Sequence, residues 1–128
     1  MPQVDDEHEL ARVEAELVAR EPIFHRPEFG TTRADFEAMT EASFWEVGAS
    51  GRIYDRAYVL DVLDERRRDP KSENWRTHGF RCASLAADTY LLTYTLELDG
   101  RTTRRATIWR RHADGWKIVY HQGTVVAD

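Results

Sequence analysis

The sequence predicts an α+β fold in which three N-terminal helices pack on a curved antiparallel sheet. The first half shows helical periodicity interrupted by one short hairpin, whereas the second half alternates like strands and carries strong turn signals. Helices that are segregated from strands in this way favour a helical layer on one face of an antiparallel sheet. The 128 residues contain no repeat, linker or low-complexity segment. We therefore expect one domain over residues 1–128.

The first helix is expected over residues 5–20. Its acidic first turn suits a helix N-terminus, and Pro22 after Glu21 marks its end. The apolar residues recur at helical spacing: Leu10, Val13, Leu17 and Val18.

A second short helix begins near Thr32, because Thr32 and Asp35 resemble a capping box. The period then changes, and residues 44–54 are typical of a hairpin around a Gly-Ala-Ser-Gly turn. A third helix follows, with Asp55 as its N-cap and Pro70 as its end.

The chain from Asn74 onward is expected to form an antiparallel meander. Asp99-Gly100 is a strong two-residue hairpin signal, residues 113–115 give a second turn, and residues 86–88 give a weaker one. The four expected strands are 75–85, 89–98, 102–111 and 116–125.

The last strand indicates that both faces of the sheet are covered. Apolar or aromatic residues occur on both of its faces: Trp116, Ile118 and Tyr120 on one, Val119, His121 and Val125 on the other. An antiparallel sheet with one wet face would alternate cleanly, and three helices can cover only one face. We therefore expect a homodimer through the second sheet face; the alternative is a monomer with scattered surface valines.

The charge pattern excludes several partners. The net charge is −5, which argues against non-specific nucleic-acid binding. Residues 1–64 contain 15 acidic and 6 basic residues, which gives a net charge of −9. Residues 65–128 contain 8 acidic and 12 basic residues, which gives a net charge of +4. The basic run 66–68 suits the C-terminus of a helix better than a nucleic-acid site. No run approaches a membrane span and no signal peptide precedes the first helix, so we expect a cytoplasmic protein.

Three segments carry a family resemblance. They are 44–52 (FWEVGASGR), 108–111 (IWRR) and 115–124 (GWKIVYHQGT). With the order of elements, they resemble the nuclear transport factor 2-like, SnoaL-like superfamily, and within it a bacterial branch of small uncharacterised proteins. The resemblance covers residues 8–125. It implies a cone with a pocket between sheet and helices and dimerisation through the sheet, but its members include isomerases, cyclases, dehydratases, hydrolases and non-enzymatic binding modules.

The acidic residues on which the superfamily's ketosteroid isomerases and polyketide cyclases depend cannot be placed on this sequence position by position. Their catalytic assignments therefore do not carry over. Candidate residues have to be taken from the chain itself.

Glu46 and His121 are the candidate catalytic residues. Glu46 lies mid-strand beside Trp45 in an apolar stretch, and a carboxyl in an apolar pocket acquires a raised pKa that suits proton transfer. His121 lies mid-strand near the end of the chain and suits the same chemistry. The alternatives are an outward-facing Glu46, or one paired with an arginine, and a histidine satisfied in the core or in an interface.

Five residues are candidate ligand-binding groups. The aromatic ones are Tyr54, Tyr94 and Trp109, which could line a pocket. Arg81 and Arg105 are strand arginines that would bind an anion if they face inward and would be surface charges if they face outward. No metal-ligand spacing and no glycine-rich phosphate loop is present, so the sequence predicts neither a metal nor a cofactor. Cys82, the only cysteine, is expected to be a small core residue.

Two functions remain open. The first is a module that binds a small hydrophobic or anionic molecule in the pocket, gripped by Arg81 or Arg105. The second is an isomerase, cyclase or dehydratase in which Glu46 moves a proton while Tyr94 or His121 stabilises the oxyanion. A buried carboxyl of raised pKa in the pocket would favour the enzyme.

Overall fold

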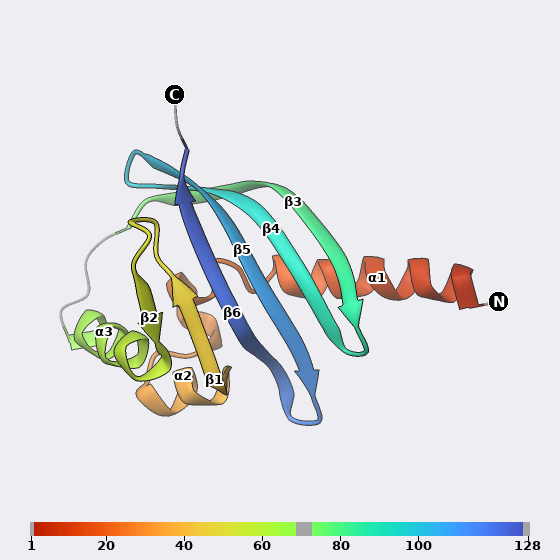
Figure 1. Ribbon diagram of the computed structural model, residues 1–128, viewed down its shortest axis with the longest axis horizontal. Coiled ribbons are helices and arrows are strands. Elements are labelled where there is room, and N and C mark those ends of the chain that lie inside the picture. Colours follow the sequence, from red (N-terminus) through yellow and green to blue (C-terminus); the bar gives the residue numbers. More distant parts are fainter. Residues whose placement is uncertain (1, 69–72, 127–128) are drawn as a thin grey trace.

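A computed structural model describes residues 2–68 and 73–126 of the chain (Figure 1). It contains helices packed against a six-stranded sheet, which confirms the predicted α+β class. The helical segments are α1 (Pro2–Val18), η1 (Ile23–His25), η2 (Pro27–Phe29), α2 (Arg33–Ala38) and α3 (Arg56–Arg68). The strands are β1 (Thr40–Val47), β2 (Ile53–Asp55), β3 (Trp75–Ala86), β4 (Thr89–Leu98), β5 (Arg101–His112) and β6 (Gly115–Val125).

The four C-terminal strands form the predicted antiparallel meander. The tight turn between β4 and β5 explains their register. Asp99 and Gly100 have φ values of 51° and 82°, the positive values that a two-residue hairpin turn of this kind requires. Asp88, in the turn between β3 and β4, also has a positive φ, of 55°.

The sheet is mixed, so the prediction of a purely antiparallel sheet is wrong in one place. The strand order is β2-β1-β6-β5-β4-β3, and β1 pairs with β6 in parallel. After the β1–β2 hairpin, α3 carries the chain to the far edge, where β3 starts the meander back towards β1. Four strands of alternating direction bring β6 alongside β1 in the same direction.

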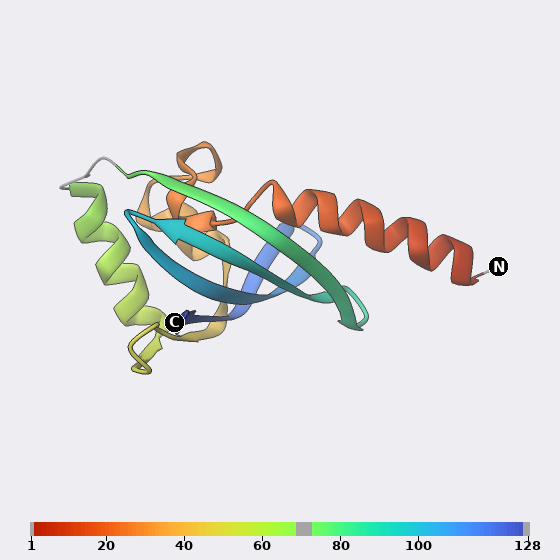
Figure 2. The same ribbon diagram turned by 90° about the horizontal axis from the view of Figure 1, so that it is seen from above.

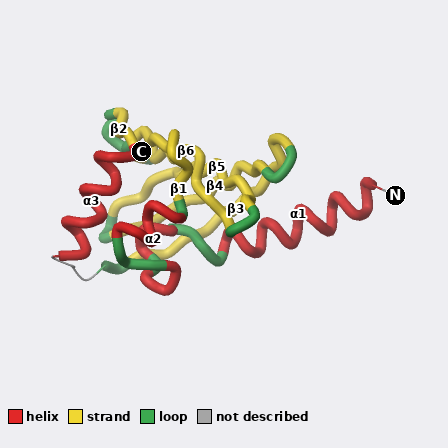
Figure 3. Tube along the Cα trace, turned by 90° about the horizontal axis from the view of Figure 1, so that it is seen from below, coloured by secondary structure: helices red, strands yellow, loops and turns green. Residues whose placement is uncertain are grey.

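The helices lie on one face of the sheet. Figures 2 and 3 show α1 and α3 towards opposite ends of this face, with α2 between them. α1 contacts β3 and β4, whereas α3 contacts β1 and β2. The core between the layers takes its side chains from every second strand position, among them Phe44, Leu92 and Leu96.

Local sequence signals fix the starts of α2 and α3. Thr32 and Asp35 form the predicted capping box, and Asp55 Oδ1 accepts a hydrogen bond from the backbone N–H of Tyr58 at the start of α3. The predicted stop at Pro70 lies outside the described residues.

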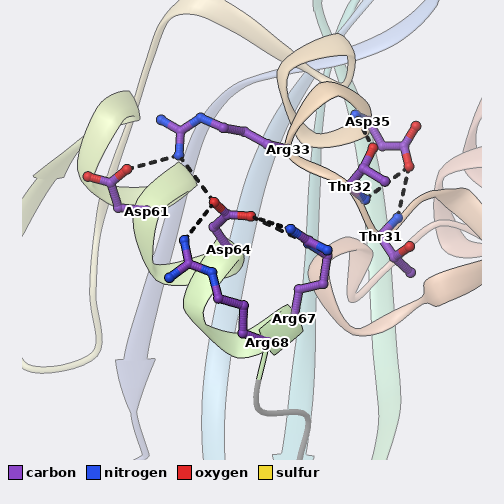
Figure 4. A network of polar contacts seen from close by, with 8 residues as sticks. All are labelled: Thr31, Thr32, Arg33, Asp35, Asp61, Asp64, Arg67 and Arg68. Atoms are coloured by element: carbon purple, nitrogen blue, oxygen red, sulfur yellow. Dashed lines mark hydrogen bonds and ion pairs between the residues drawn. The ribbon is translucent and has the colours of Figure 1, made fainter.

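A network of ion pairs links α2 to α3 (Figure 4). Arg33 contacts Asp61 at 2.9 Å and Asp64 at 3.9 Å. Asp64 also pairs with Arg67 at 3.2 Å and with Arg68 at 3.3 Å. Two of the three arginines in the run 66–68 therefore serve α3 itself.

The opposite sheet face carries apolar side chains with no helix over them among the described residues. The rings of Trp45 and Tyr120 pack against each other with centroids 4.6 Å apart and planes inclined by 56°, and their exposed neighbour Ile53 on β2 is 69% accessible. No helix in the described ranges is long and apolar enough to cross a membrane.

Candidate functional site

A cavity of about 250 Å³ lies between the helices and the inner face of the sheet. η1 and one side of α3 form its helical wall, and side chains of β1, β4, β5 and β6 form its floor. Its lining is partly apolar and partly titratable, which is typical of a small-molecule site.

Glu46 faces this cavity from β1. Its Cα pairs with that of His121 on β6, so the two residues lie side by side on the inner face. Trp45 points the other way, onto the outer face. Burial raises the pKa of the Glu46 carboxyl, while the charges of Arg105 and Arg66 lower it in part. No side chain in the described part of the chain forms a hydrogen bond or an ion pair with Glu46.

His121 is held as a neutral imidazole in one tautomer. Nη1 of Arg105 lies 3.3 Å from Nε2, and because arginine can only donate, Nε2 is the acceptor. The ring proton is therefore on Nδ1, which donates to Oγ1 of Thr107 at 2.8 Å. Burial, followed by the charges of Arg105 and His25, lowers the pKa of His121 to about 3. His121 consequently offers no N–H to a ligand.

Glu21 is a buried residue of the cavity wall that the sequence does not single out. Its side chain is 1% exposed at the cavity wall, between α1 and η1. Oε1 accepts from the Tyr94 hydroxyl at 3.0 Å and from the Ile23 backbone at 3.2 Å, and Oε2 accepts from Nε1 of Trp109 at 3.0 Å. One feature of the sequence could have indicated a special environment for Glu21. A carboxylate near the C-terminal end of a helix is unfavourable because it lies at the negative end of the helix dipole.

The Glu21 carboxyl is surrounded by donors. Burial raises its pKa, whereas hydrogen bonds from Thr107, Ile23, Tyr94 and Trp109 lower it in part. Thr107 accepts from His121, and its hydroxyl lies close enough to Glu21 to lower the pKa of that carboxyl, so Thr107 lies between the two groups. The pKa of Tyr94 is raised well above its ordinary value by burial and by the neighbouring Glu21, so its proton stays on the phenol.

Arg105 lies along the floor of the cavity because β6 has a glycine opposite it. A Cβ atom at Gly123 would lie 3.1 Å from Nη1 and 3.2 Å from Cζ of Arg105. Nε of Arg105 donates to Oγ1 of Thr103 at 2.9 Å, which fixes the side chain from a second direction.

Aromatic rings form the outer part of the wall. Tyr54 of β2 stacks on Tyr58 of α3, with centroids 4.7 Å apart and planes 9° apart. A Cβ atom at Gly48 would lie 2.8 Å from Cε2 of Tyr54, so this ring position also depends on a glycine.

The structure therefore brings most of the predicted site residues together and separates two. The cavity lining includes five of the seven: Glu46, Tyr54, Tyr94, Arg105 and His121. Arg81 pairs with Thr93 on β4 and lies on the outer face, the alternative that the sequence left open. Trp109 points inward but is fully buried beneath Glu21, so it supports the wall without lining it.

The described residues offer little for metal or thiol chemistry. No three His, Cys, Asp or Glu side chains in residues 2–68 and 73–126 converge in a way that could hold a metal ion. Burial raises the pKa of Cys82 to about 11, so its thiol is not a nucleophile near neutral pH. The arrangement suits proton transfer at Glu46 and charge stabilisation at Arg105.

Comparison of the sequence with known proteins finds no matching family model and no matching curated protein. The fold, however, matches many solved structures. A proposed dehydratase of the NTF2-like family from Streptomyces avermitilis superposes with a TM-score of 0.72 at 18% identity, over 100% of both chains.

Two further bacterial structures agree. An NTF2-like protein of unknown function in nutrient uptake from Rhodospirillum rubrum gives a TM-score of 0.66 at 18% identity, over 92% of this chain and 98% of that one. An NTF2-like protein from Cytophaga hutchinsonii gives a TM-score of 0.65 at 12% identity, over 98% of this chain and 100% of that one. With its helices on one face of the six-stranded sheet and its cavity between them, the chain has the NTF2-like fold.

Proposed function

We propose that this chain binds a small molecule in the inner cavity and moves a proton on it, with Glu46 as the group that accepts and returns the proton. The carboxyl of Glu46 carries this proposal. It faces the cavity, its pKa is raised by burial, and no described side chain occupies its oxygen atoms. A carboxyl in that state is tuned towards the pKa range in which general bases work.

The reaction begins at a carbon next to a carbonyl. The C–H bond breaks, the proton goes to a carboxylate oxygen of Glu46, and the electron pair moves to the carbonyl oxygen to give an enolate. Return of the proton to another carbon completes an isomerisation. In a dehydration the enolate electrons instead form a C=C bond as a hydroxyl group β to the carbonyl departs, and Glu46 gives its proton to that hydroxyl so that it leaves as water. The Streptomyces avermitilis structure, described as a proposed dehydratase, supports the second class.

Arg105 is the group best placed to stabilise the enolate. The Tyr94 hydroxyl donates to Glu21, and the N–H of His121 donates to Thr107, so neither proton is directed at a ligand. The guanidinium of Arg105 lines the cavity and has N–H groups beyond those that bind Thr103 and His121. A fixed cation beside the developing charge lowers the barrier without reorganisation.

A second candidate function is ligand binding without catalysis. It is favoured by the hydrogen bonds of Tyr94 and His121, because the protons of these two groups are engaged within the protein and neither is directed at a ligand. The two functions differ in whether a bound carbonyl compound exchanges its carbon-bound protons.

Proton exchange tests the proposal directly. The full chain in D₂O is incubated with a panel of small ketones and oxo acids, and loss of the α-proton signals is followed by NMR. Glu46→Gln should lower the exchange rate of a responsive compound by about 10²- to 10⁴-fold. Glu41→Gln is the matched control, because Glu41 lies on the same strand but pairs with Arg110 and His112 outside the cavity.

An unchanged rate in Glu46→Gln would contradict the role of Glu46. Binding of panel compounds with no exchange in the unmodified chain would instead support the ligand-binding function.

We also propose a homodimer formed through the outer sheet face. Trp45, Tyr120 and Ile53 lie there without cover from any helix in the described ranges. Paired large apolar groups on an open sheet face favour association with a second such face.

A further inference from the structure

The arginine run at the end of α3 is divided between two tasks. Arg67 and Arg68 pair with Asp64 on the same helix (Figure 4). Arg66 turns the other way and lines the inner cavity, where its Nη1 donates to the backbone oxygen of Phe24 at 3.2 Å. One side chain of the run is thus half-buried and directed away from the ion-pair network.

Arg66 lies where the cavity meets a neighbouring groove. The groove has a volume of about 350 Å³ and shares Phe24, His25, Leu63 and Arg66 with the cavity. A group held by Arg66 would therefore lie near the opening between the two, while Arg105 lies on the sheet side of the cavity.

Neither cavity arginine has an anionic partner in the described part of the chain. No Asp or Glu oxygen among these residues lies within 4.0 Å of the guanidinium of Arg66 or Arg105. The charges of Arg105 and Arg66 both lower the pKa of Glu46, although neither arginine forms an ion pair with it. A half-buried guanidinium costs free energy unless it is paired, and each is already fixed by a hydrogen bond on one side.

We propose that the ligand of this cavity is a small organic carboxylate, whose carboxylate group binds Arg66 at the opening and whose reacting carbonyl lies against Arg105. The inference rests on the proposed function for the role of Arg105, but the carboxylate site itself stands on the geometry of Arg66. Arginine binds carboxylates through two parallel N–H donors, which gives both affinity and orientation.

The rest of the wall limits the size and polarity of the ligand. A cavity of about 250 Å³ is at the small end of ligand sites and suits one ring with one or two substituents. Tyr58, Val59 and Leu63 of α3 supply the apolar wall beside Arg66. The class is therefore an oxo acid of about the size of a substituted six-membered ring.

Three probes separate the features of this class. Benzoylformate carries a ring, a ketone and a carboxylate; acetophenone lacks the carboxylate, and benzoate lacks the ketone. Calorimetric titration of the full chain should show benzoylformate binding at least tenfold more tightly than acetophenone, with benzoate between them. Benzoylformate has no α-hydrogen, so its binding is measured without reaction.

Two variants locate the carboxylate. Arg66→Gln should abolish the preference for benzoylformate over acetophenone. Arg68→Gln removes the same charge from the same helical turn, but Arg68 is exposed and pairs with Asp64, so the preference should remain. Equal weakening by both variants would show a general charge effect and would overturn the site, as would equal affinity for the two probes or the absence of benzoylformate binding.

The two proposals fail in different ways. If acetophenone binds and exchanges its methyl protons through Glu46 while benzoylformate does not bind, the carboxylate site is wrong and the proton transfer stands. If benzoylformate binds through Arg66 while no enolisable compound exchanges, the carboxylate site stands and the proton transfer is wrong.

Discussion

The hydroxyl of Tyr94 donates a hydrogen bond to Oε1 of Glu21 over 3.0 Å, and so ties the middle of β4 to the segment that follows α1. Both groups are buried, and Trp109 donates to the other oxygen of the same carboxyl. The cavity wall therefore contains a carboxyl whose partners all come from the protein itself.

Tyr94→Phe should destabilise the chain by about 1.5–3 kcal/mol, because it removes a hydrogen-bond donor from a buried carboxyl. The free energy of unfolding in urea measures the loss. Tyr120→Phe is the control, since its hydroxyl binds Gln122 on the outer face and its removal should cost less than about 0.5 kcal/mol. Equal costs in the two variants would contradict the importance of the Glu21 contact.

The free energy of unfolding should decrease as the pH is lowered below 6.5, because of His121. The unfolded chain takes up a proton near pH 6.5, whereas the folded pKa is lowered to about 3, so the stabilisation is complete above 6.5 and is lost progressively towards pH 3. Each pH unit in this window costs about 1.4 kcal/mol. When the pH is lowered from 7 to 5, the free energy of unfolding of His121→Gln should decrease by about 1–2 kcal/mol less than that of the unmodified chain. The exposed His8 provides the control variant, His8→Gln, which should retain the full dependence.

Glu46→Gln should stabilise the chain at pH 7. The raised pKa of Glu46 means that folding favours its protonated form, so its contribution is intact below the unfolded pKa and is lost as the pH rises through the folded one. Replacement by an uncharged amide should raise the free energy of unfolding by about 0.5–2 kcal/mol at pH 7, with the difference disappearing near pH 4. A variant that is less stable than the unmodified chain at pH 7 would count against a desolvated carboxyl.

Gly123→Ala should displace the guanidinium of Arg105, because the new methyl group needs the space beside Nη1. The NMR signals of Arg105 Nε and of the His121 ring nitrogens should shift, while the free energy of unfolding changes by less than about 1 kcal/mol. Gln122→Ala alters the next residue of β6, which faces outward, and should leave both signals in place. Unshifted signals in Gly123→Ala would mean that this glycine does not determine the position of Arg105.

Ile53→Glu should weaken the proposed dimer, because it places a charge in the exposed apolar part of the outer face. Sedimentation at micromolar concentration should give twice the mass of one chain for the unmodified protein and a larger monomer fraction for the variant. Ala15→Glu on the exposed side of α1 controls for added charge. A monomeric unmodified protein at this concentration would refute the dimer.

The strands of the meander were predictable to within one or two residues. Their period of two and the Asp99-Gly100 turn are local signals, and local signals determine hairpins. The parallel pairing of β1 with β6 was not predictable in this way, because it depends on where α3 returns the chain and leaves no mark in either strand.

Residues of the candidate site were predictable from the sequence only where their own segment marks them. Glu46 stands out because it is a carboxyl inside an apolar strand. Glu21 does not, since its partners Tyr94 and Trp109 lie 73 and 88 positions away. Arg66 is indistinguishable by sequence from Arg67 and Arg68, and its different role follows from its direction on α3.

The parallel pairing of β1 with β6 also has a consequence for how the protein folds. The hairpins of the meander close short loops, whereas this pairing joins the first strand of the chain to the last one. Pairing across such a separation costs more chain entropy and is slow to form. Glu46 and His121 become neighbours only when this pairing is made, so we expect the cavity to be completed in the last stage of folding, after the meander that forms most of its floor.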